Sequence, residues 1–183
     1  MLNCIDSRTP TELVFDLGLG DGFGVRGASN VSSSKVPGSM EDDRAVAEAR
    51  LLLAMGHSRC AAVMAAVDLT IRSADAAQET GSTNVGPILL DIQEDLPAEF
   101  FSQGCNLSGE SLADFVALVA RRHVITVVRR IRKQSPVSNR MNEAAEIGIE
   151  GTRYDVYTGS LEFLDETVAG MSAVDVKADV NAD

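Results

Sequence analysis

Two thiols and one imidazole constrain the fold of this chain more than any other feature of its sequence. Cys4 lies in a short apolar stretch at the N-terminus, and His57 and Cys60 follow the apolar run 51–55. Two cysteines and one histidine form a ligand set of catalytic zinc sites, which leave a fourth position open to water. One ion meets all three only if the fold brings the two segments side by side. We therefore predict that Cys4, His57 and Cys60 hold one Zn²⁺ ion per chain; the alternative is two buried thiols beside a polar histidine.

A carboxylate and a guanidinium stand close to the first cysteine. Asp6 and Arg8 lie on one side of an extended stretch, because alternate side chains of a strand point the same way. Facing groups of these types form a charge-assisted, bidentate pair. Two interpretations stay open at this point, a structural ion pair or a catalytic pair beside the metal.

Composition limits the classes of function. The chain has 183 residues, 45% of them hydrophobic, which suffices for the core of one domain that we place at 1–165. Residues 166–183 are acidic, rich in small residues and without a period, so we expect a weakly ordered tail there. A net charge of −11 disfavours nucleic acid and anionic membranes as partners.

Cysteine usage and hydropathy indicate a compartment. The chain has three cysteines, and Met1-Leu2 leads directly into the first candidate ligand without the pattern of a signal peptide. An odd number of cysteines favours a reducing cytoplasm over a disulfide framework. No apolar run reaches the ~18–20 residues of a membrane span. We therefore expect a cytoplasmic protein.

Strands alternate with helices along the sequence. The expected strands are 2–5, 23–26 and 51–55, the main expected helices are 61–71 and 111–134, residues 100–109 are expected to be a connection, and 147–157 pairs with 160–164 in a hairpin. This order predicts an α/β fold with a parallel sheet and helices on both faces. In open α/β sheets ligand sites lie at the carboxyl ends of the strands, where the three candidate ligands stand.

Six stretches, taken in order, resemble one enzyme family. They are Cys4-Ile5-Asp6-Ser7-Arg8, the segment from Gly20-Asp21 to Arg26-Gly27-Ala28-Ser29-Asn30, Gly38-Ser39-Met40-Glu41, His57-Ser58-Arg59-Cys60, Ser135-Pro136-Val137 and Tyr154-Asp155-Val156-Tyr157-Thr158-Gly159. Together they are similar to the pattern of the β-class carbonic anhydrases. The resemblance covers about 2–165, nearly the whole chain.

The resemblance implies a fold and a chemistry. The family has a small, mostly parallel sheet with an antiparallel edge strand, and its members form homodimers that often pair into dimers of dimers. It implies a lyase, carbonate dehydratase, in which zinc-bound hydroxide attacks CO2 to give bicarbonate and a proton. Asp6 would orient the nucleophile and Arg8 would hold Asp6. In some members the aspartate moves onto the metal in a closed form, so the same change is a hypothesis for Asp6.

Other functions remain open beside this one. A COS or CS2 hydrolase of the same fold would use the same attack, and a non-catalytic zinc-binding paralogue would use only the ligands. Arg26 matches a family position near the metal, where a surface role is the alternative. His123 is expected to be a packed or solvated side chain of the long helix, and Cys105 a spare thiol.

Two departures from the family pattern have structural consequences. Ser29 stands where the family has glycine, so a positive φ at this position would strain the loop. Family members also carry a segment before the first ligand that wraps the partner subunit, whereas only Leu2 and Asn3 separate Met1 from Cys4. The resemblance therefore leaves the stability of the dimer and the rigidity of the site open.

Overall fold

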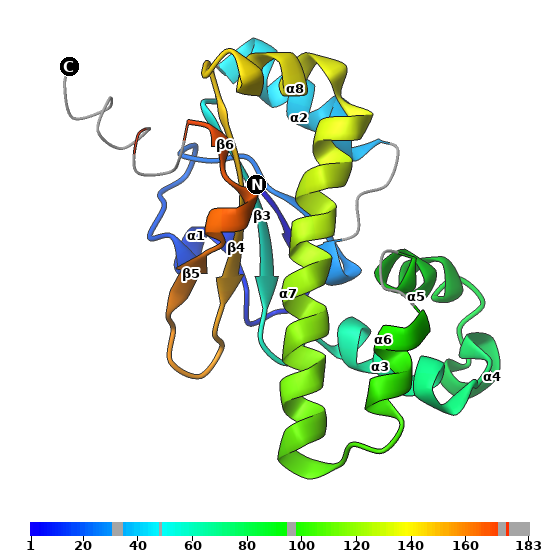
Figure 1. Ribbon diagram of the computed structural model, residues 1–183. Helices are drawn as coiled ribbons and strands as arrows, with labels where there is room; N and C mark the ends of the chain where they lie inside the picture. The colour runs from blue at the N-terminus through cyan, green and yellow to red at the C-terminus, as the bar shows by residue number, and fades with distance from the viewer. Residues whose placement is uncertain (31–34, 48, 95–97, 172–174, 176–183) are drawn as a thin grey trace.

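A computed structural model describes residues 1–30, 35–47, 49–94, 98–171 and 175 (Figure 1). Among these residues the strands are β1 Leu2–Cys4, β2 Val25–Gly27, β3 Leu51–His57, β4 Gly148–Tyr154, β5 Leu161–Phe163 and β6 Ala169–Gly170. The helices are α1 Thr11–Val14, α2 Val36–Ala47, α3 Ala61–Arg72, α4 Ala76–Thr80, α5 Gly86–Gln93, α6 Ala98–Gly104, α7 Gly109–Gln134 and α8 Pro136–Glu143, with 3-10 turns at Ala28–Asn30 and Asp165–Thr167.

The sheet is mostly parallel, as the sequence predicts. Its order is β2-β1-β3-β4-β5, and β1, β2, β3 and β4 all run in the same direction. β5 and β6 pair antiparallel with β4 at its two ends. The carboxyl ends of β1 and β3 therefore lie next to each other, because Leu2 pairs with Ala54 and Asn3 with Met55. This register brings the residue after Asn3 beside the end of β3.

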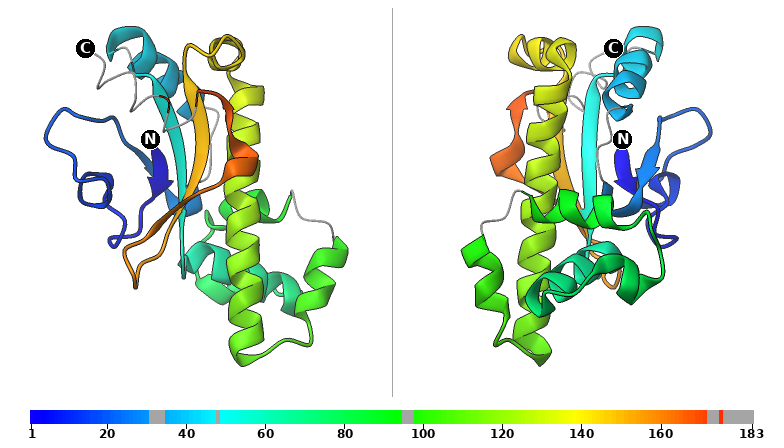
Figure 2. Two further views of the ribbon diagram at one scale, coloured as in Figure 1. Left: turned by 60° about the vertical axis from the view of Figure 1, so that its left-hand side comes forward. Right: turned by 90° about the vertical axis from the view of Figure 1, so that its right-hand side faces the viewer.

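The long helix α7 packs closely against one face of β3 and β4 (Figure 2). The contact needs two glycines: a Cβ at Gly56 would overlap Cγ2 of Val124, and one at Gly151 would lie 2.9 Å from Cγ1 of the same valine. Val127 and Ile131 continue this buried face of the helix. The sequence of β3 and β4 thus allows the helix axis to come close to the strands that end at the site.

Helices cover both faces of the sheet. Leu2 belongs to the buried cluster that includes Val127 and Val128 of α7, whereas the adjacent residue Asn3 points to the other face. There its Nδ2 donates to the carbonyl oxygen of Thr9 and to Oγ1 of Thr11 at the start of α1. The expected fold class, a mostly parallel sheet with an antiparallel edge and helices on both faces, is confirmed.

Two stretches differ from the sequence predictions. Residues 98–104 form α6, not a connection, and Phe100 of this helix stacks on Phe115 of α7. The ordered part also extends past the predicted boundary at Asp165, because β6 pairs with β4 and Thr167 is buried. The remainder of the expected tail lies outside the described residues, except Asp175.

None of the helices described is both long and apolar enough to cross a membrane.

Candidate metal centre

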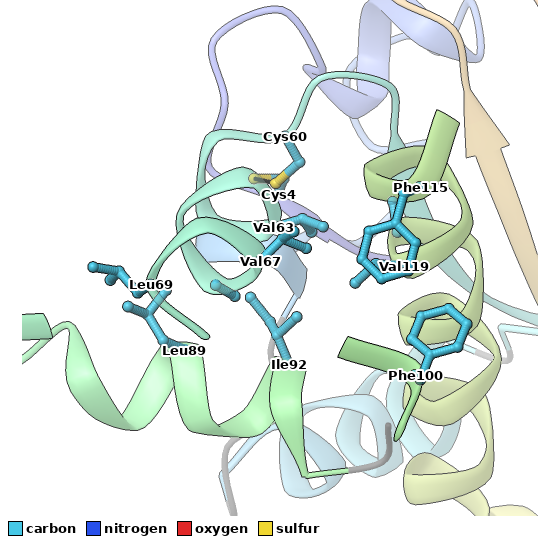
Figure 3. Packing of buried hydrophobic residues seen from close by; sticks show 12 residues of the cluster. Cys4, Cys60, Val63, Val67, Leu69, Leu89, Ile92, Phe100, Phe115 and Val119 are labelled. Atoms are coloured by element: carbon cyan, nitrogen blue, oxygen red, sulfur yellow. Dashed lines mark hydrogen bonds between the residues drawn. The ribbon is translucent and has the colours of Figure 1, made fainter. Parts of the chain in front are cut away.

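Three candidate ligands meet at the carboxyl ends of β1 and β3. Cys4 ends β1, His57 ends β3, and Cys60 is the residue before the first turn of α3. Their ligand atoms all lie within 4.8 Å of one another, and all three residues are buried. The two sulfur atoms are 4.0 Å apart and face each other at the start of α3 (Figure 3).

The imidazole of His57 is held in one tautomer. Its Nδ1 lies 3.0 Å from the carbonyl oxygen of Ser58, and because that oxygen only accepts, Nδ1 carries the hydrogen. Nε2 is therefore a lone-pair donor, and it is buried without a hydrogen-bond partner among the described residues. A ring nitrogen prepared in this way is the form that binds a metal.

The two thiols differ in their affinity for a proton. The hydrogen bond from Cys4 lowers the pKa of Cys60 to about 6, and the backbone N–H of Val63 in the first turn of α3 adds to this effect. The same bond, together with burial, raises the pKa of Cys4 to about 12. The bond between the two sulfurs therefore favours the thiolate form at Cys60 over that at Cys4.

This donor set fits a zinc ion. Two cysteine sulfurs and one unpartnered imidazole nitrogen converge on a single buried position, and three protein ligands of these types are the set of catalytic zinc sites. Among the described residues no other group of three or more His, Cys, Asp or Glu side chains converges in this way. The residues present thus match the group that the sequence predicts.

The carboxylate of Asp6 lies at the edge of the cluster. Its Oδ2 is 3.9 Å from Nε2 of His57. Arg8 binds it with two parallel hydrogen bonds, Nε to Oδ1 at 2.9 Å and Nη2 to Oδ2 at 2.7 Å, and Nη2 also reaches the carbonyl oxygen of Arg59 at 3.1 Å. The bonds from Arg8 hold the pKa of Asp6 well below its usual range. The two residues are thus brought together as predicted, in a bidentate pair that faces the ligands.

Arg26 has a backbone-binding position that sequence reasoning did not find. Its Nε donates to the carbonyl oxygen of Cys4 at 3.0 Å and its Nη2 to that of Asp6 at 2.7 Å. Thr9 donates from Oγ1 to the same carbonyl of Asp6 at 3.0 Å. The segment that carries Cys4 and Asp6 is thereby fixed from the side of β2. The register of β1 with β2, which pairs Asn3 with Arg26, was not readable from the sequence.

The loop after β2 touches the first ligand. The backbone N–H of Ser29 donates to Sγ of Cys4 at 3.3 Å. Ser29 has φ 53° and ψ 34°, and Asn30 has φ 48°, so two consecutive non-glycine residues adopt the left-handed conformation. The expected strain at Ser29 is confirmed, because this conformation costs roughly 1–2 kcal/mol for most L-residues.

A groove begins beside Cys60. Its volume is about 980 Å³, and it runs between α3 and α7. Cys60 is one of its lining residues, with Met64, Val67, Leu112 and Val116 giving it apolar walls. A small neutral molecule therefore has an apolar surface next to the cluster.

The remaining candidates are placed away from the cluster or in supporting positions. His123 is buried in α7 and bonds to the backbone of Ser29, so it is a packed side chain as predicted. Cys105 is exposed and is not part of a disulfide.

Comparisons with known proteins agree with this geometry. The family model described as carbonic anhydrase matches residues 1–161. The chain is 31% identical to "Carbonic anhydrase 2" of Mycobacterium tuberculosis over 160 residues, which is 87% of this chain and 70% of the relative. It is 29% identical to "Carbonic anhydrase" of Mycolicibacterium smegmatis, over 88% of this chain and 72% of the relative.

Solved structures show the same fold. The β-carbonic anhydrase CafA of Aspergillus fumigatus superposes with a TM-score of 0.72 and 23% identity, covering 99% of this chain and 80% of that one. A structure described among two tetrameric β-carbonic anhydrases from Sordaria macrospora gives a TM-score of 0.69 and 19% identity, over 89% and 78% of the two chains.

Proposed function

The chain belongs to the carbonic anhydrase family and has the fold of its β-class members, and on this premise we propose that it catalyses the reversible hydration of CO2 to bicarbonate and a proton. The observation that carries the proposal is the buried cluster of two thiols and one unpartnered imidazole nitrogen, with the Asp6–Arg8 pair at its edge. Family membership supports the reaction type, and the cluster supports the cofactor.

The metal that fits the cluster is Zn²⁺, one ion per chain, held by Cys4, His57 and Cys60. Zinc held by three protein ligands supplies Lewis acidity, which lowers the pKa of a water molecule in its open position towards about 7. Two thiolates also balance the charge of the dication, so the centre is neutral overall. The buried position keeps the three donors away from bulk water.

Asp6 orients the nucleophilic water in this proposal. Its Oδ2 accepts from Arg8 at one lone pair and keeps acceptor capacity on the side of His57, 3.9 Å away. Arg8 acts through Asp6: its two bonds fix the plane of the carboxylate, and its third bond, to the carbonyl of Arg59, ties that plane to the loop that carries Cys60. The side chain of Arg8 thus links the two segments of the site.

The substrate fits the surroundings of the cluster. CO2 is small, apolar and uncharged, and the groove beside Cys60 has apolar walls from α3 and α7. The reaction needs an electrophilic carbon to approach a water that Asp6 orients. The same surface admits COS and CS2, so the assay below includes both.

We also propose that the protein acts as a homodimer or dimer of dimers in the cytoplasm. Several large apolar side chains near β1 and β2 are exposed in the single chain: Ile5, Leu13, Leu19 and Phe23. Exposed apolar side chains gathered in one region favour an interface between subunits. The fold neighbours from Sordaria macrospora are described as tetrameric. None of the three cysteines is in a disulfide, which suits a reducing compartment. Light scattering after gel filtration measures the assembly.

Stopped-flow hydration of CO2 with a pH indicator tests the function. The protein is used with its zinc content quantified, beside a Cys60→Ala variant that retains Asp6 and Arg8. We expect about one zinc per chain and a rate far above that of the variant. Sulfide release from COS and CS2 is measured on the same sample. One zinc per chain with neither hydration nor sulfide release would refute the enzyme and leave a non-catalytic zinc protein.

A further inference from the structure

His123 lies in α7, far along the chain from both ligand segments, yet its side chain reaches the loop that contacts Cys4. It is 3% exposed, and Nε2 lies 2.8 Å from the carbonyl oxygen of Ser29. Because a carbonyl oxygen only accepts, Nε2 donates this hydrogen bond. The imidazole thus binds the backbone of the residue whose N–H meets the ligand.

The backbone of Ser29 makes two hydrogen bonds, one as donor and one as acceptor. Its N–H donates to Sγ of Cys4 at 3.3 Å, and its C=O accepts from His123. With φ 53° at Ser29 and 48° at Asn30, both buried, this turn is unfavourable by itself. Such conformations persist where neighbouring groups hold them. His123 supplies a fixed partner on the side opposite the ligand.

The position of His123 is fixed by the residue that follows it. Val124 packs against Gly56 and Gly151, with no room for a Cβ at either glycine. Gly56 immediately precedes the ligand His57. The distance from α7 to the end of β3 is therefore set by close packing, and the imidazole extends from this fixed point to Ser29.

We propose that His123 is a positioning residue for the metal centre: through Ser29 it aims a backbone N–H at the Cys4 thiolate. This inference rests on the proposed function, since it assumes that Cys4 is a zinc ligand. An N–H bonded to a thiolate stabilises its charge and fixes the direction of the sulfur lone pairs. Groups that orient ligands in this way contribute about 10–100-fold to metal affinity or activity.

Two substitutions separate the hydrogen bond from the volume of the side chain. His123→Phe keeps a planar ring but has no donor. His123→Gln places an amide N–H as many bonds from Cβ as Nε2 of histidine, so it retains the bond to Ser29. Val127→Ala is the matched control, because it removes buried volume from the same helix and leaves Ser29 untouched.

Two measurements other than activity report on the thiolate. The first is the dissociation constant of Zn²⁺, from competition with a chromophoric chelator. The second is the thiolate-to-metal charge-transfer absorption of the Co²⁺-loaded protein. We expect His123→Phe to bind Zn²⁺ about 10-fold or more weakly. We expect its band at longer wavelength, because a thiolate without its N–H donor gives up electron density more readily. His123→Gln should resemble the native protein in both.

The results for the Val127→Ala control and for the native protein show whether a change in His123→Phe comes from the lost hydrogen bond. Val127→Ala should lower the unfolding temperature of the metal-free protein and leave the band in place. The inference is overturned if His123→Phe keeps the native band and affinity, or if Val127→Ala shifts the band equally. If His123→Phe does not fold, His123→Asn replaces it, because its shorter amide does not reach Ser29. Failure of the native protein itself to bind Zn²⁺ or hydrate CO2 would instead refute the proposed function.

Discussion

The two ends of the sheet both bury polar side chains, and they satisfy them in different ways. At the amino end of β4, Nδ2 of Asn142 donates to the carbonyl oxygens of Ile147 and Ala169, which joins α8 to β4 and β6. Nearby, Ser135 bonds to Ser138 in the first turn of α8 and to Glu41 of α2. These bonds are all made between groups of the chain itself.

At the carboxyl ends of β1 and β3 the side chains converge, and within the part of the chain that the structure describes they leave one ligand nitrogen unpaired. Nε2 of His57 has no hydrogen-bond partner among the described residues, and the sulfurs of Cys4 and Cys60 face each other across 4.0 Å. A buried polar group without a partner is unfavourable, so a ligand that pairs with it gains that free energy. Burial of polar residues is common to both ends; the unpaired lone pairs distinguish the metal centre.

The largest expected effect is a loss of Zn²⁺ affinity after a ligand at the carboxyl ends of β1 and β3 is replaced. Cys4→Ser keeps an acceptor for the N–H of Ser29 but replaces a thiolate by a hydroxyl, a poor zinc ligand. Structural zinc sites with four ligands bind with about 10–16 kcal/mol in total, so each ligand contributes roughly a quarter of that free energy. Loss of one ligand should therefore lower the Zn²⁺ affinity by about two to three orders of magnitude. Unfolding of the metal-free protein in urea should change by less than about 1 kcal/mol. If the free energy of unfolding of the metal-free variant fell by as much as the free energy of Zn²⁺ binding, Cys4 would instead have a structural role.

Next in size is the effect at the edge of the cluster. Asp6→Asn retains the shape of the side chain but loses the bidentate acceptor that Arg8 binds. We expect kcat for CO2 hydration to fall by about 100-fold, within the range of positioned proton-accepting groups. The zinc content should stay near one per chain, which dialysis and metal analysis measure. If the variant instead lost zinc in proportion to its loss of activity, Asp6 would be needed for zinc binding and not only for orienting the water.

At the amino end we expect the reverse pattern. Asn142→Ala leaves the carbonyl oxygens of Ile147 and Ala169 without the amide that pairs them. The free energy of unfolding should fall by about 2 kcal/mol, because buried groups left unpaired carry the full desolvation cost. CO2 hydration per folded molecule and zinc affinity should remain native. Loss of zinc affinity in this variant would contradict the independence of the two ends.

The smallest effect concerns the hairpin beside the site. Backbone N–H groups of Thr158 and Tyr157 bond to Asp155 and lower its pKa below the ordinary value. A lowered pKa stabilises the folded state above the unfolded pKa of about 3.9, and this contribution is lost as pH falls through the folded value. The stability difference between native protein and Asp155→Asn should thus be constant from pH 7 to about 5 and shrink below about 4. Urea unfolding at several pH values checks it, and an unchanging difference would contradict it.

Part of the site was predictable because it depends on residue types within two short segments, 4–8 and 57–60. Cysteine and histidine are common ligands of zinc, and Asp6 and Arg8 are two residues apart, close enough to pair; in the structure they pair at the turn after β1, not along a strand. The sequence also predicted the mostly parallel sheet, since strands alternate with helices. It did not predict α6, which packs its Phe100 against Phe115 of α7. Nor did it place β6 in the sheet, because a two-residue strand has no pattern of its own.

By itself the sequence determined the chemistry available to this protein: two thiols, one imidazole and a carboxylate–guanidinium ion pair, in segments that end or follow strands. Only the tertiary structure decided which backbone groups support them. Arg26 binds the carbonyls around Cys4 because β2 pairs with β1 in one register, and His123 reaches Ser29 because Val124 packs onto Gly56. These contacts join residues distant in sequence through strand register and close packing. Neither property is written in a local pattern of residues.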